Sequence, residues 1–564
     1  MSAPTRSIKE FTSYLSHMKK SKLSTLLCLL VLSVSARQPD PLKQIDQLFS
    51  AWNNATPGVA VAVQQGDKII YNKAFGLADL EHNVPNTPST VFESGSVAKQ
   101  FTAMSILLLA AEGKLSLTDD IRKYVPEIPK YSTTITIQML LNHTSGLKDW
   151  GSVGSLTGWP RTTRIYTQDL ALQIMSKQKS TNYTPGTEYS YSNANYSLLV
   201  TIVERVSGKS LADFTEEKLF KPLGMTHTQW RDNFREIVPN RAIAYRKNKD
   251  AYEQLMPFED IHGHGGLLTT TGDLLKWNTL LETQAIGGDQ VYNWRVQKGK
   301  LTNRKEIEYA AGLFVSNFYT ATFDKFNEIS HSGSTAGYKA WLAYYPEKKV
   351  SIVALSNDAG FNPTQTGRQI ARIMLSSNTQ HQPEMADTFE KLSNLKLREP
   401  DLKKFEGIWR SIRHMNVQVL ERKGDQILQN NTVLSAAHPD TLYHYGLQKW
   451  IYTKPGRITV VAQQDTLSYI KVAPPDLSSK SLTALAGTYY SDEADATYKV
   501  EIKNNEAWIN NKPFAPYKLI PSFKDGFFSD DGNLYEFRRD KKGRVTQLLV
   551  STGRAIHVPF NKIN

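Results

Sequence analysis

The chain has 564 residues, of which 40% are hydrophobic, 10% aromatic and 21% charged. This apolar content is enough for packed cores and excludes a wholly disordered chain, and the ordinary numbers of Gly (33) and Pro (25) exclude a collagen-like or low-complexity polymer. The net charge is +13, but no block of five like charges and no basic stripe interleaved with aromatic residues occurs, so no nucleic-acid partner is expected.

The first 36 residues have the pattern of a secretory signal peptide. A basic segment beginning at Met18 precedes an apolar run over 23–32 and small residues that end at Ala36, where a signal peptidase would cleave. The run is much shorter than the roughly 20 residues that span a bilayer, and no later segment is long enough, so we expect no stable membrane span. Residues 1–17 do not resemble the start of a signal, which makes Met18 an alternative start.

The single cysteine, Cys28, lies inside that apolar run. Lipid anchoring there is not expected, because Leu26 and Leu27 stand where small residues would be needed. Cleavage after Ala36 would leave a mature chain without disulfides, metal thiolates or a cysteine nucleophile. The sequence therefore predicts an exported protein, periplasmic or secreted.

Hydrophobic periodicity predicts the elements of a first domain over 37–376. Helices are expected over 42–52, 96–109, 135–141, 195–206 and 271–281, the fourth closed by Gly208 and the fifth capped by Thr271 or Asp273. Hairpins are expected from two buried strands at 59–63 and 69–71, and from strands at 338–345 and 350–355. Helices placed between antiparallel hairpins indicate an α+β fold, an antiparallel sheet flanked by helices.

The remaining residues predict a linker over 377–400 and two small β modules. Phe405-Glu406-Gly407-Ile408-Trp409-Arg410-Ser411 is echoed 80 residues later by Leu485-Ala486-Gly487-Thr488-Tyr489-Tyr490-Ser491. Short alternating runs separated by Gly, Asp and Asn turns follow each copy. Many short strands without helices predict antiparallel β-barrels or sandwiches, over 401–475 and 476–564.

The chemistry predicted for the first domain rests on Ser96-Val97-Ala98-Lys99. A serine becomes a nucleophile when a base lies beside it, and a lysine at i+3 shares its face of a helix. The same spacing occurs at Ser16, Ser145, Ser176, Ser393 and Ser468. Ser96 alone follows a Ser-Gly turn and begins a long apolar helix, whose first-turn N–H groups favour developing negative charge.

Two later motifs supply candidate partners for this pair. Tyr191-Ser192-Asn193 follows a loop opened by Pro185-Gly186; a tyrosine near cations can have a lowered pKa and move protons. The Asn193 amide is expected to donate to Lys99 and to a substrate carbonyl.

The third motif, His331-Ser332-Gly333, is expected to open a strand. His331 is a candidate substrate contact, and Gly333 would leave room for substrate along the strand edge. The N–H of Ser334 is expected to join that of Ser96 in an oxyanion hole.

Together the three motifs resemble those of the serine β-lactamase and penicillin-binding-protein superfamily, on its class C side. Class A members carry Ser-x-x-Lys, Ser-Asp-Asn and Lys-Thr-Gly, and class C members have Tyr-x-Asn second, as at Tyr191 and Asn193. The resemblance covers roughly residues 40–375 and includes Pro57–Val59, Phe75–Asp79, Leu117–Asp120, Leu140–Leu147 and Gly265–Leu267.

One departure from the superfamily pattern bears on substrate. Lys-Thr-Gly is replaced by His331-Ser332-Gly333, which is similar to the D-aminopeptidases and several esterases of the superfamily. A neutral histidine holds a substrate carboxylate less well than lysine, which weakens the case for antibiotic hydrolysis. The D-aminopeptidases also carry two small lipocalin-like barrels after the catalytic domain, and one barrel loop reaches their active site; the sequence assigns no such loop here.

Other polar residues are interpreted as structural. Ser145, in Ser145-Gly146-Leu147-Lys148, is the rival nucleophile, but it follows a helix instead of starting one. His143 is interpreted as a loop-capping side chain. His262 and His264 lack a third ligand in view, so no metal is expected, and no cofactor is implied.

The sequence thus predicts an exported serine hydrolase. Ser96 would attack a carbonyl, Lys99 with Tyr191 would remove its proton, and Tyr191 would pass that proton to the leaving group. The resemblance implies peptide, amide or ester substrates, including D-amino-acid compounds such as cell-wall fragments. The alternatives are a D-alanyl-D-alanine carboxypeptidase or β-lactamase on the same scaffold, and a non-catalytic ligand-binding protein. Oligomeric state and the role of the barrels stay open.

Overall fold

The computed structural model describes residues 40–159, 165–320, 324–376, 395–413, 415–444, 448–462, 465–511 and 515–563. The predicted signal peptide, with Met18 and Cys28, lies outside these residues, as does 377–394 of the predicted linker. The chain divides into two units, residues 1–48 and 49–564. The described part of the first unit is helix α2 (Pro41–Leu48), which ends four residues earlier than predicted.

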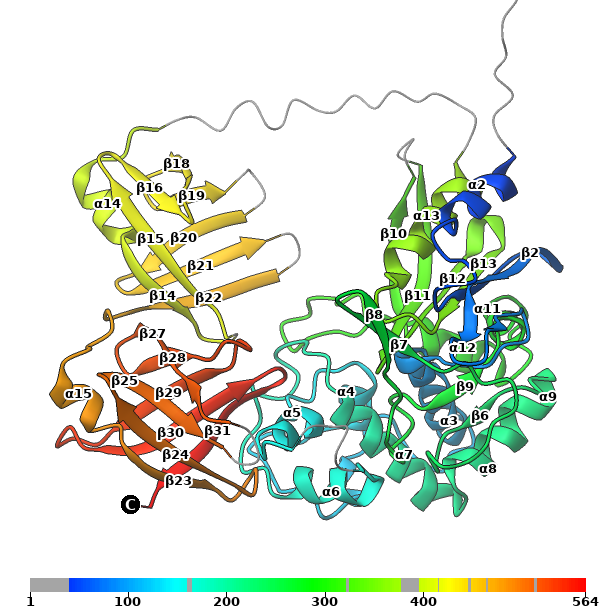
Figure 1. Cartoon of the computed structure of the whole chain (residues 1–564), viewed down its shortest axis with the longest axis horizontal. Helices are drawn as coiled ribbons and strands as arrows, with labels where there is room; N and C mark the ends of the chain where they lie inside the picture. The colour runs from blue at the N-terminus through cyan, green and yellow to red at the C-terminus, as the bar shows by residue number, and fades with distance from the viewer. Residues whose placement is uncertain are drawn as a thin grey trace, which may run out of the picture. The chain divides into compact units, whose positions relative to one another are not determined.

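Strands from both ends of the first domain form one antiparallel sheet (Figure 1). In the described residues its order is β10-β11-β12-β13-β1-β2, with bounds Phe314–Tyr319, Lys325–Thr335, Tyr338–Tyr345, Val350–Ser356, Val59–Gln65 and Lys68–Phe75. Central β1 pairs Val61 with Ala354 of β13 and with Lys73 of β2. Both predicted hairpins are therefore confirmed, and the α+β class with them.

Strand β2 differs from its prediction as a buried strand. It lies at the sheet edge with one neighbouring strand, and Ile69 is 52% exposed. Strand β1, with a neighbour on each side, buries all of Val59–Val63. A short apolar run alone does not distinguish an edge strand from a central one.

The helices lie in the sequence between β2 and β10, and one more follows β13. Their bounds are η2 Gly95–Ala98, α3 Lys99–Ala111, η3 Ile121–Lys123, α4 Ile137–Leu141, α5 Trp150–Ser155, α6 Gln168–Ser176, α7 Asn193–Ser207, α8 Leu211–Thr215, the π-helical η4 Glu216–Phe220, α9 Lys221–Leu223, α10 Thr271–Asn278, α11 Leu280–Thr283 and α12 Gly288–Val296, with η5 Pro346–Lys348 between β12 and β13 and α13 Pro363–Leu375 after them. Short strands accompany them: β3 Leu77–Asp79, β4 Val84–Pro85, β5 Phe92–Glu93, β6 Gln229–Trp230, β7 Tyr245–Asn248, β8 Ala251–Gln254 and β9 Leu267–Thr269.

Helix α3 lies at the centre of the domain core. All its residues from Lys99 to Leu109 are buried, and a helix that is apolar on every side needs partners all round. The Phe101 ring stacks on Trp277 of α10, with centroids 4.0 Å apart. The helix predicted over 96–109 therefore forms as a 3₁₀ turn, η2, that continues into α3.

The predicted C-terminal end of α7 is confirmed, whereas the N-cap of α10 lies at a different residue from the one predicted. Helix α7 stops at Gly208, whose φ of 70° is the left-handed conformation that favours glycine. Helix α10 is capped by Thr270, whose hydroxyl accepts from the Asp273 N–H (3.2 Å). The cap thus precedes the predicted Thr271 or Asp273, because the capping oxygen must stand before the first helical residue.

The C-terminal region contains two nearly closed antiparallel barrels, each of nine strands in the described residues. The first follows α14 (Glu399–Phe405) in the order β17-β16-β15-β14-β22-β21-β20-β19-β18. Its strands in chain order, β14 to β22, are Gly407–Ser411, Val417–Lys423, Gln426–Gln429, Thr432–Val433, Ser435–His438, Thr441–His444, Gln448–Lys454, Arg457–Ala462 and Asp465–Val472.

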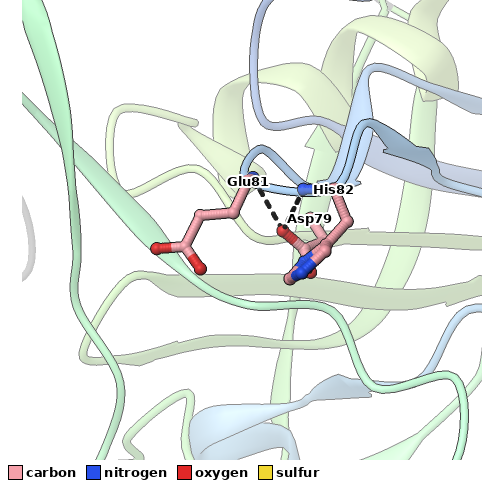
Figure 2. Close-up of side chains that lie close together, drawn as sticks. All are labelled: Asp79, Glu81 and His82. Carbon is pink, nitrogen blue, oxygen red and sulfur yellow. Dashed lines mark hydrogen bonds and ion pairs between the residues drawn. The ribbon is translucent and has the colours of Figure 1, made fainter.

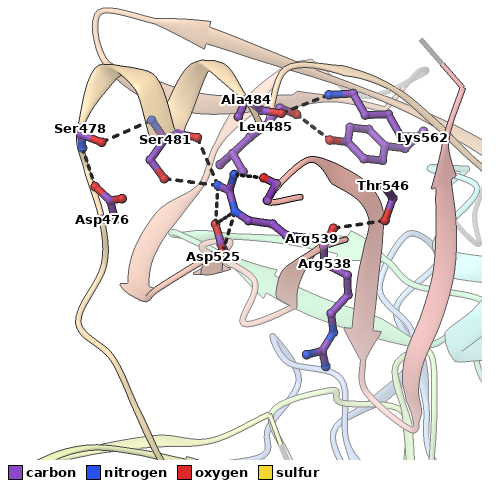
Figure 3. A network of polar contacts seen from close by, with 12 residues as sticks. Asp476, Ser478, Ser481, Ala484, Leu485, Asp525, Arg538, Arg539, Thr546 and Lys562 are labelled. Carbon is purple, nitrogen blue, oxygen red and sulfur yellow. Dashed lines mark hydrogen bonds and ion pairs between the residues drawn. The ribbon is translucent and has the colours of Figure 1, made fainter. Parts of the chain in front are cut away.

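The second barrel follows α15 (Ser479–Thr483) in the corresponding order, β26-β25-β24-β23-β31-β30-β29-β28-β27. Its strands β23 to β31 are Gly487–Ser491, Ala496–Lys503, Glu506–Asn510, Tyr517–Lys518, Ile520–Phe523, Gly526–Phe528, Leu534–Arg539, Val545–Thr552 and Ala555–Lys562. Figure 3 shows Arg539 tying α15 to this barrel: its guanidinium bonds Asp525 (2.8 Å) and Ser481.

The sequence repeat corresponds to one structural position in the two barrels. Each copy leads from a short helix into the first barrel strand: the first begins at the last residue of α14, and the second begins two residues after the end of α15. The Trp409 indole N–H donates to the Phe405 carbonyl (2.6 Å), and the Tyr489 hydroxyl donates to the Leu485 carbonyl (2.7 Å). A large ring thus bonds the carbonyl four residues before it in both modules, so the repeated residues make the same contact in each barrel.

Candidate active site

Ser96 is positioned by a close contact between two backbones. It lies in η2, against β11. A Cβ on Gly333 of β11 would stand 2.0 Å from the Ser94 carbonyl oxygen, and a Cβ on Gly95 would stand 2.6 Å from the Ser334 nitrogen. Gly95 also has a φ of +51°. Glycine at both positions lets η2 pack closely on the strand; that Gly333 also leaves room for substrate along the strand edge stays a prediction.

Lys99 begins α3 one turn after Ser96, and its side chain is fully buried. Its Nζ lies 3.2 Å from Ser96 Oγ and donates to Asn193 Oδ1 (2.9 Å) and the His264 carbonyl (2.6 Å). Once the amine is uncharged, these two bonds use its two N–H groups and its lone pair is left for the Ser96 hydroxyl. Burial lowers the pKa of Lys99 well below its ordinary value, and the positive charge of Arg554 lowers it further, against an opposing effect of Asp149. This arrangement can present an uncharged amine to the serine hydroxyl.

Tyr191 contacts the same pair through its ring and its hydroxyl. Lys99 Nζ lies 4.8 Å from the ring centroid. The Tyr191 hydroxyl is buried and has no hydrogen-bond partner of good geometry among the described residues. Burial raises the pKa of Tyr191, although the nearby Ser96 hydroxyl and Arg554 charge oppose the rise. The expected lowering of its pKa is therefore wrong: the phenol is neutral, because desolvation outweighs the nearby cation.

Asn193 is the first residue of α7. It was expected to donate a hydrogen bond to Lys99, but it accepts one instead. Its Oδ1 accepts from Lys99, so its amide N–H groups do not serve the lysine. Its backbone N–H donates to Asp149 Oδ2 (2.7 Å), while Asp149 Oδ1 accepts from Ser152 (3.1 Å). Asp149 therefore caps α5 and also holds the first N–H of α7. Sequence reasoning missed both roles, although an Asp directly before a helix is a recognisable cap.

His331 lies within β11 and does not open a strand as predicted. Its side chain is buried, with Nδ1 2.6 Å from the Ser332 carbonyl and Nε2 3.1 Å from the Tyr309 hydroxyl. Burial lowers the pKa of His331 to about 3, with a further contribution from Lys99. The neutral ring thus donates from Nδ1 and accepts at Nε2, and both nitrogens are used within the protein.

A cavity of about 220 Å³ opens beside the nucleophile. Its lining includes Ser96, Asn193 and Ser334, so the two residues expected to supply the oxyanion hole border the same space. Arg231 and Glu93 also line it and form a buried ion pair, Nε to Oε2 at 2.9 Å. Arg231 Nη1 has no hydrogen-bond partner within the described ranges.

Tyr191 packs in a cluster of rings that includes His143 and Tyr309. The His143 ring lies 4.3 Å from the Tyr191 ring and 4.7 Å from that of Tyr309. His143 Nδ1 lies 2.9 Å from Asn195 Nδ2 and 3.3 Å from the Ser192 nitrogen. The loop-capping interpretation of His143 is therefore confirmed, whereas the part played by Tyr309 had no signal in the sequence.

The rival nucleophile is engaged elsewhere. Ser145 Oγ donates to Asn195 Oδ1 (2.5 Å) and accepts from the Leu147 N–H, and Lys148 pairs with Glu493 (2.8 Å). The two residues of that Ser-x-x-Lys spacing thus belong to separate contacts.

No third metal-ligating side chain gathers with His262 and His264 in the described part of the chain. A different group, Asp79, Glu81 and His82, lies together at a turn (Figure 2). There Asp79 Oδ1 accepts the backbone N–H groups of Glu81 (2.8 Å) and His82 (3.1 Å), and Oδ2 lies 2.7 Å from His82 Nδ1. The bonds of the turn account for this grouping.

Comparison with known proteins agrees with the geometry. A family model described as Beta-lactamase matches residues 45–373. Penicillin-binding protein 4* of Bacillus subtilis is 29% identical over 315 residues, which are 53% of this chain and 68% of that protein. Other curated relatives are matched over 63% of their length.

Solved structures with the same fold are more distant in sequence. The octameric penicillin-binding protein homologue from Pyrococcus abyssi has a TM-score of 0.50 at 23% identity and covers 80% of this chain and 100% of its own. A D-stereospecific amidohydrolase from Streptomyces has a TM-score of 0.50 at 19% identity and covers 60% and 100%. Among the described helices none is both long and apolar enough to cross a membrane.

Proposed function

Because the chain belongs to the beta-lactamase family of serine hydrolases, we propose that it transfers the acyl group of peptide, amide or ester substrates to Ser96. The observation that carries this proposal is the contact of Lys99 Nζ with Ser96 Oγ at 3.2 Å, made by a lysine whose pKa burial holds far below its ordinary value. An uncharged amine within hydrogen-bond reach of a serine can act as the general base that activates the hydroxyl as a nucleophile.

The lowered pKa of Lys99 and the raised pKa of Tyr191 support the following proton transfers. Lys99 takes the Ser96 proton as Oγ bonds to the substrate carbonyl carbon, and the carbonyl oxygen becomes an oxyanion beside the N–H groups of Ser96 and Ser334. The neutral Tyr191 hydroxyl gives its proton to the leaving nitrogen or oxygen as that bond breaks, and Lys99 returns a proton to Tyr191. Water then attacks the acyl-enzyme by the same route in reverse and frees Ser96.

The substrates that we favour are amides, peptides and esters, with D-amino-acid compounds among them. The His331 motif supports this preference, since a neutral buried histidine cannot supply the charge that the lysine of Lys-Thr-Gly offers to a β-lactam carboxylate. The fold is shared with a D-stereospecific amidohydrolase, which is consistent with the preference but carries no more than the fold.

The test is a panel of D- and L-amino-acid amides, 4-nitrophenyl esters and nitrocefin, with a fluorophosphonate probe to label the nucleophile. We expect ester or amide turnover and labelling in the wild type and neither in Ser96→Ala. Ser176→Ala is the matched control, because Ser176 has the same spacing to Lys179 but lies on α6. Turnover that survives in Ser96→Ala would move the chemistry elsewhere, and a folded wild type that never labels would favour a non-catalytic binding protein.

A second candidate is penicillin recognition on the same scaffold, favoured by the 29% identity to penicillin-binding protein 4*. A labelled penicillin separates the two. Durable acylation of Ser96 would indicate a carboxypeptidase and rapid turnover a β-lactamase, whereas neither is expected of a peptidase or esterase. Export is tested separately. The protein is recovered from outside the cytoplasm, and its molecular mass should correspond to a chain that begins at Arg37.

A further inference from the structure

The tip of one hairpin of the second barrel touches the candidate active site. Strands β30 and β31 are joined by Gly553 and Arg554. The Arg554 N–H donates to Ser152 Oγ (3.0 Å), and its carbonyl accepts from the Asp149 N–H (3.2 Å) and from Asn182 Nδ2 (2.9 Å). Three hydrogen bonds to the catalytic domain therefore hold the backbone of this one residue.

This anchoring connects the barrel to the catalytic lysine in three steps. Asp149 bonds the Arg554 carbonyl through its N–H and the Asn193 N–H through its carboxylate. Asn193 in turn accepts from Lys99. These hydrogen bonds position the Arg554 backbone relative to Lys99.

The Arg554 side chain extends over the group that moves protons. Its guanidinium carbon lies 4.9 Å from the centroid of the Tyr191 ring. Arg554 is exposed, and its hydrogen bonds with the residues that the structure describes are made by its backbone, not by its guanidinium. The Asp149 carboxylate accepts two backbone N–H groups and forms no ion pair with this guanidinium among the described residues.

Arg231 and Arg554 differ in whether a carboxylate pairs with the guanidinium. Arg231 also borders the site, but Glu93 pairs with it through two hydrogen bonds, at 2.9 and 3.2 Å. Arg554, by contrast, has a backbone held by hydrogen bonds and an exposed guanidinium that lies over the Tyr191 ring without such a partner among the described residues. A guanidinium presents a fork of N–H donors that matches a carboxylate.

We propose that Arg554 is a specificity-determining residue that binds a carboxylate of the substrate, so that the second barrel selects acidic acyl or leaving groups for the catalytic domain. This inference rests on the proposed function. The third motif has His331 where Lys-Thr-Gly has a lysine. In this proposal the positive charge that would bind the substrate carboxylate comes instead from Arg554 of the second barrel, on the Tyr191 side of the site.

Two pairs of synthetic esters test the proposal. On the acyl side, the mono-4-nitrophenyl ester of glutaric acid is compared with 4-nitrophenyl butyrate. On the leaving-group side, 3-(butyryloxy)benzoate is compared with 3-(butyryloxy)benzamide. The quantity measured is the ratio of kcat/KM for the charged ester to that for its neutral counterpart, in wild type, Arg554→Gln, Arg554→Lys and Arg554→Glu.

We expect the wild type to favour the carboxylate in one of the two pairs. Arg554→Gln should lower that ratio about tenfold to a hundredfold, the loss of one charge-assisted contact. Arg554→Lys should restore part of it, and Arg554→Glu should lower it further. Arg544→Gln, which removes an exposed arginine of the same barrel paired with Asp540, is the control and should leave the ratio unchanged.

The outcomes separate this proposal from the one on which it rests. No preference for either carboxylate in the wild type, or equal losses on the charged and neutral esters in Arg554→Gln, would overturn the role of Arg554 while leaving the hydrolase intact. Absence of turnover of both neutral esters and of every amide in the panel above, or turnover that survives in Ser96→Ala, would overturn the hydrolase itself.

Discussion

Lys99 illustrates how burial determines the chemistry of a single residue. Its ammonium has no exposed surface, and its hydrogen-bond partners are a hydroxyl, an amide oxygen and a backbone carbonyl instead of a carboxylate. Without a carboxylate in direct contact, desolvation outweighs the opposing effect of Asp149, and the pKa of Lys99 is lowered toward the neutral amine. Had Lys99 faced a carboxylate, the same spacing to Ser96 would have produced an ion pair and no base.

The pH dependence of turnover follows from this environment. The rate of a neutral ester should rise with pH as Lys99 loses its proton, with the plateau beginning well below the ordinary pKa of lysine, 10.5. Arg554 lowers this pKa and Asp149 raises it, so Arg554→Gln should move the acidic limb of the kcat/KM profile to higher pH. Arg544→Gln should not move it. A limb that stays in place or moves to lower pH would contradict this account of Lys99.

His331 makes an acid-dependent contribution to stability. Its folded-state pKa of about 3 lies below the ordinary value of 6.5, so the unfolded chain binds the proton first. The stabilisation is complete above pH 6.5 and is lost as the pH falls toward 3. At about 1.4 kcal/mol per pKa unit, the loss between pH 7.5 and 4.5 is about 2–3 kcal/mol.

His331→Gln should remove this pH dependence, because glutamine can bond Tyr309 and the Ser332 carbonyl without titrating. The measurement is the difference in Tm between wild type and variant at pH 7.5 and 4.5. We expect the variant to be less stable at pH 7.5 and to lose less on acidification. A parallel loss in both proteins would show that His331 does not titrate in this range.

At the scale of elements, the crossing of η2 over β11 positions the nucleophile. Gly95 and Gly333 permit it, and both are local features of the first and third motifs. The sequence therefore predicted which residues matter at this crossing. It did not predict the use of the glycine, since the contact between Gly333 and the Ser94 carbonyl joins segments that are more than 200 residues apart.

Gly333→Ala should displace the start of α3 from the strand. The added Cβ would stand 2.0 Å from the Ser94 carbonyl oxygen, and a shift of about 1 Å in a catalytic group can reduce turnover about 10²-fold. Gly272→Ala is the control, because the nearest atom to its Cβ lies at 4.0 Å. The measurement is kcat for an ester on both variants, with circular dichroism to check folding. If Gly333→Ala were as active as Gly272→Ala, the close contact of Gly333 with Ser94 would not be what positions Ser96.

At the scale of the whole molecule, the second barrel is joined to the catalytic domain through a shared core. Val153 and Leu156, from α5 and the residue after it, pack in the barrel cluster. The Leu156 carbonyl accepts from the Tyr498 hydroxyl (3.0 Å) and from Asn511. Lys148 and Glu493 form an ion pair at 2.8 Å, with side chains 0% and 2% exposed. These contacts hold the Arg554 hairpin at the site.

Removing one member of this ion pair should be costlier than removing both. Lys148→Met leaves Glu493 buried without a partner and should destabilise the protein by about 3–5 kcal/mol, whereas Lys148→Met with Glu493→Met removes both charges and should regain most of that loss. Calorimetry of the single and double variants measures this. A double variant less stable than Lys148→Met would mean that the pair is not an isolated charge couple.

The sequence by itself determined the local features of this protein: the serine and lysine one turn apart, the hairpins, the glycine stop of α7 and the repeat that begins each barrel. These depend on spacing and turn residues, which act over a few positions. Only the tertiary structure decided which distant groups meet Lys99, in what protonation state Tyr191 stands, and that Arg554 approaches from the second barrel. Burial and charge at a site are sums over neighbours brought together by packing, and separation along the chain does not encode them.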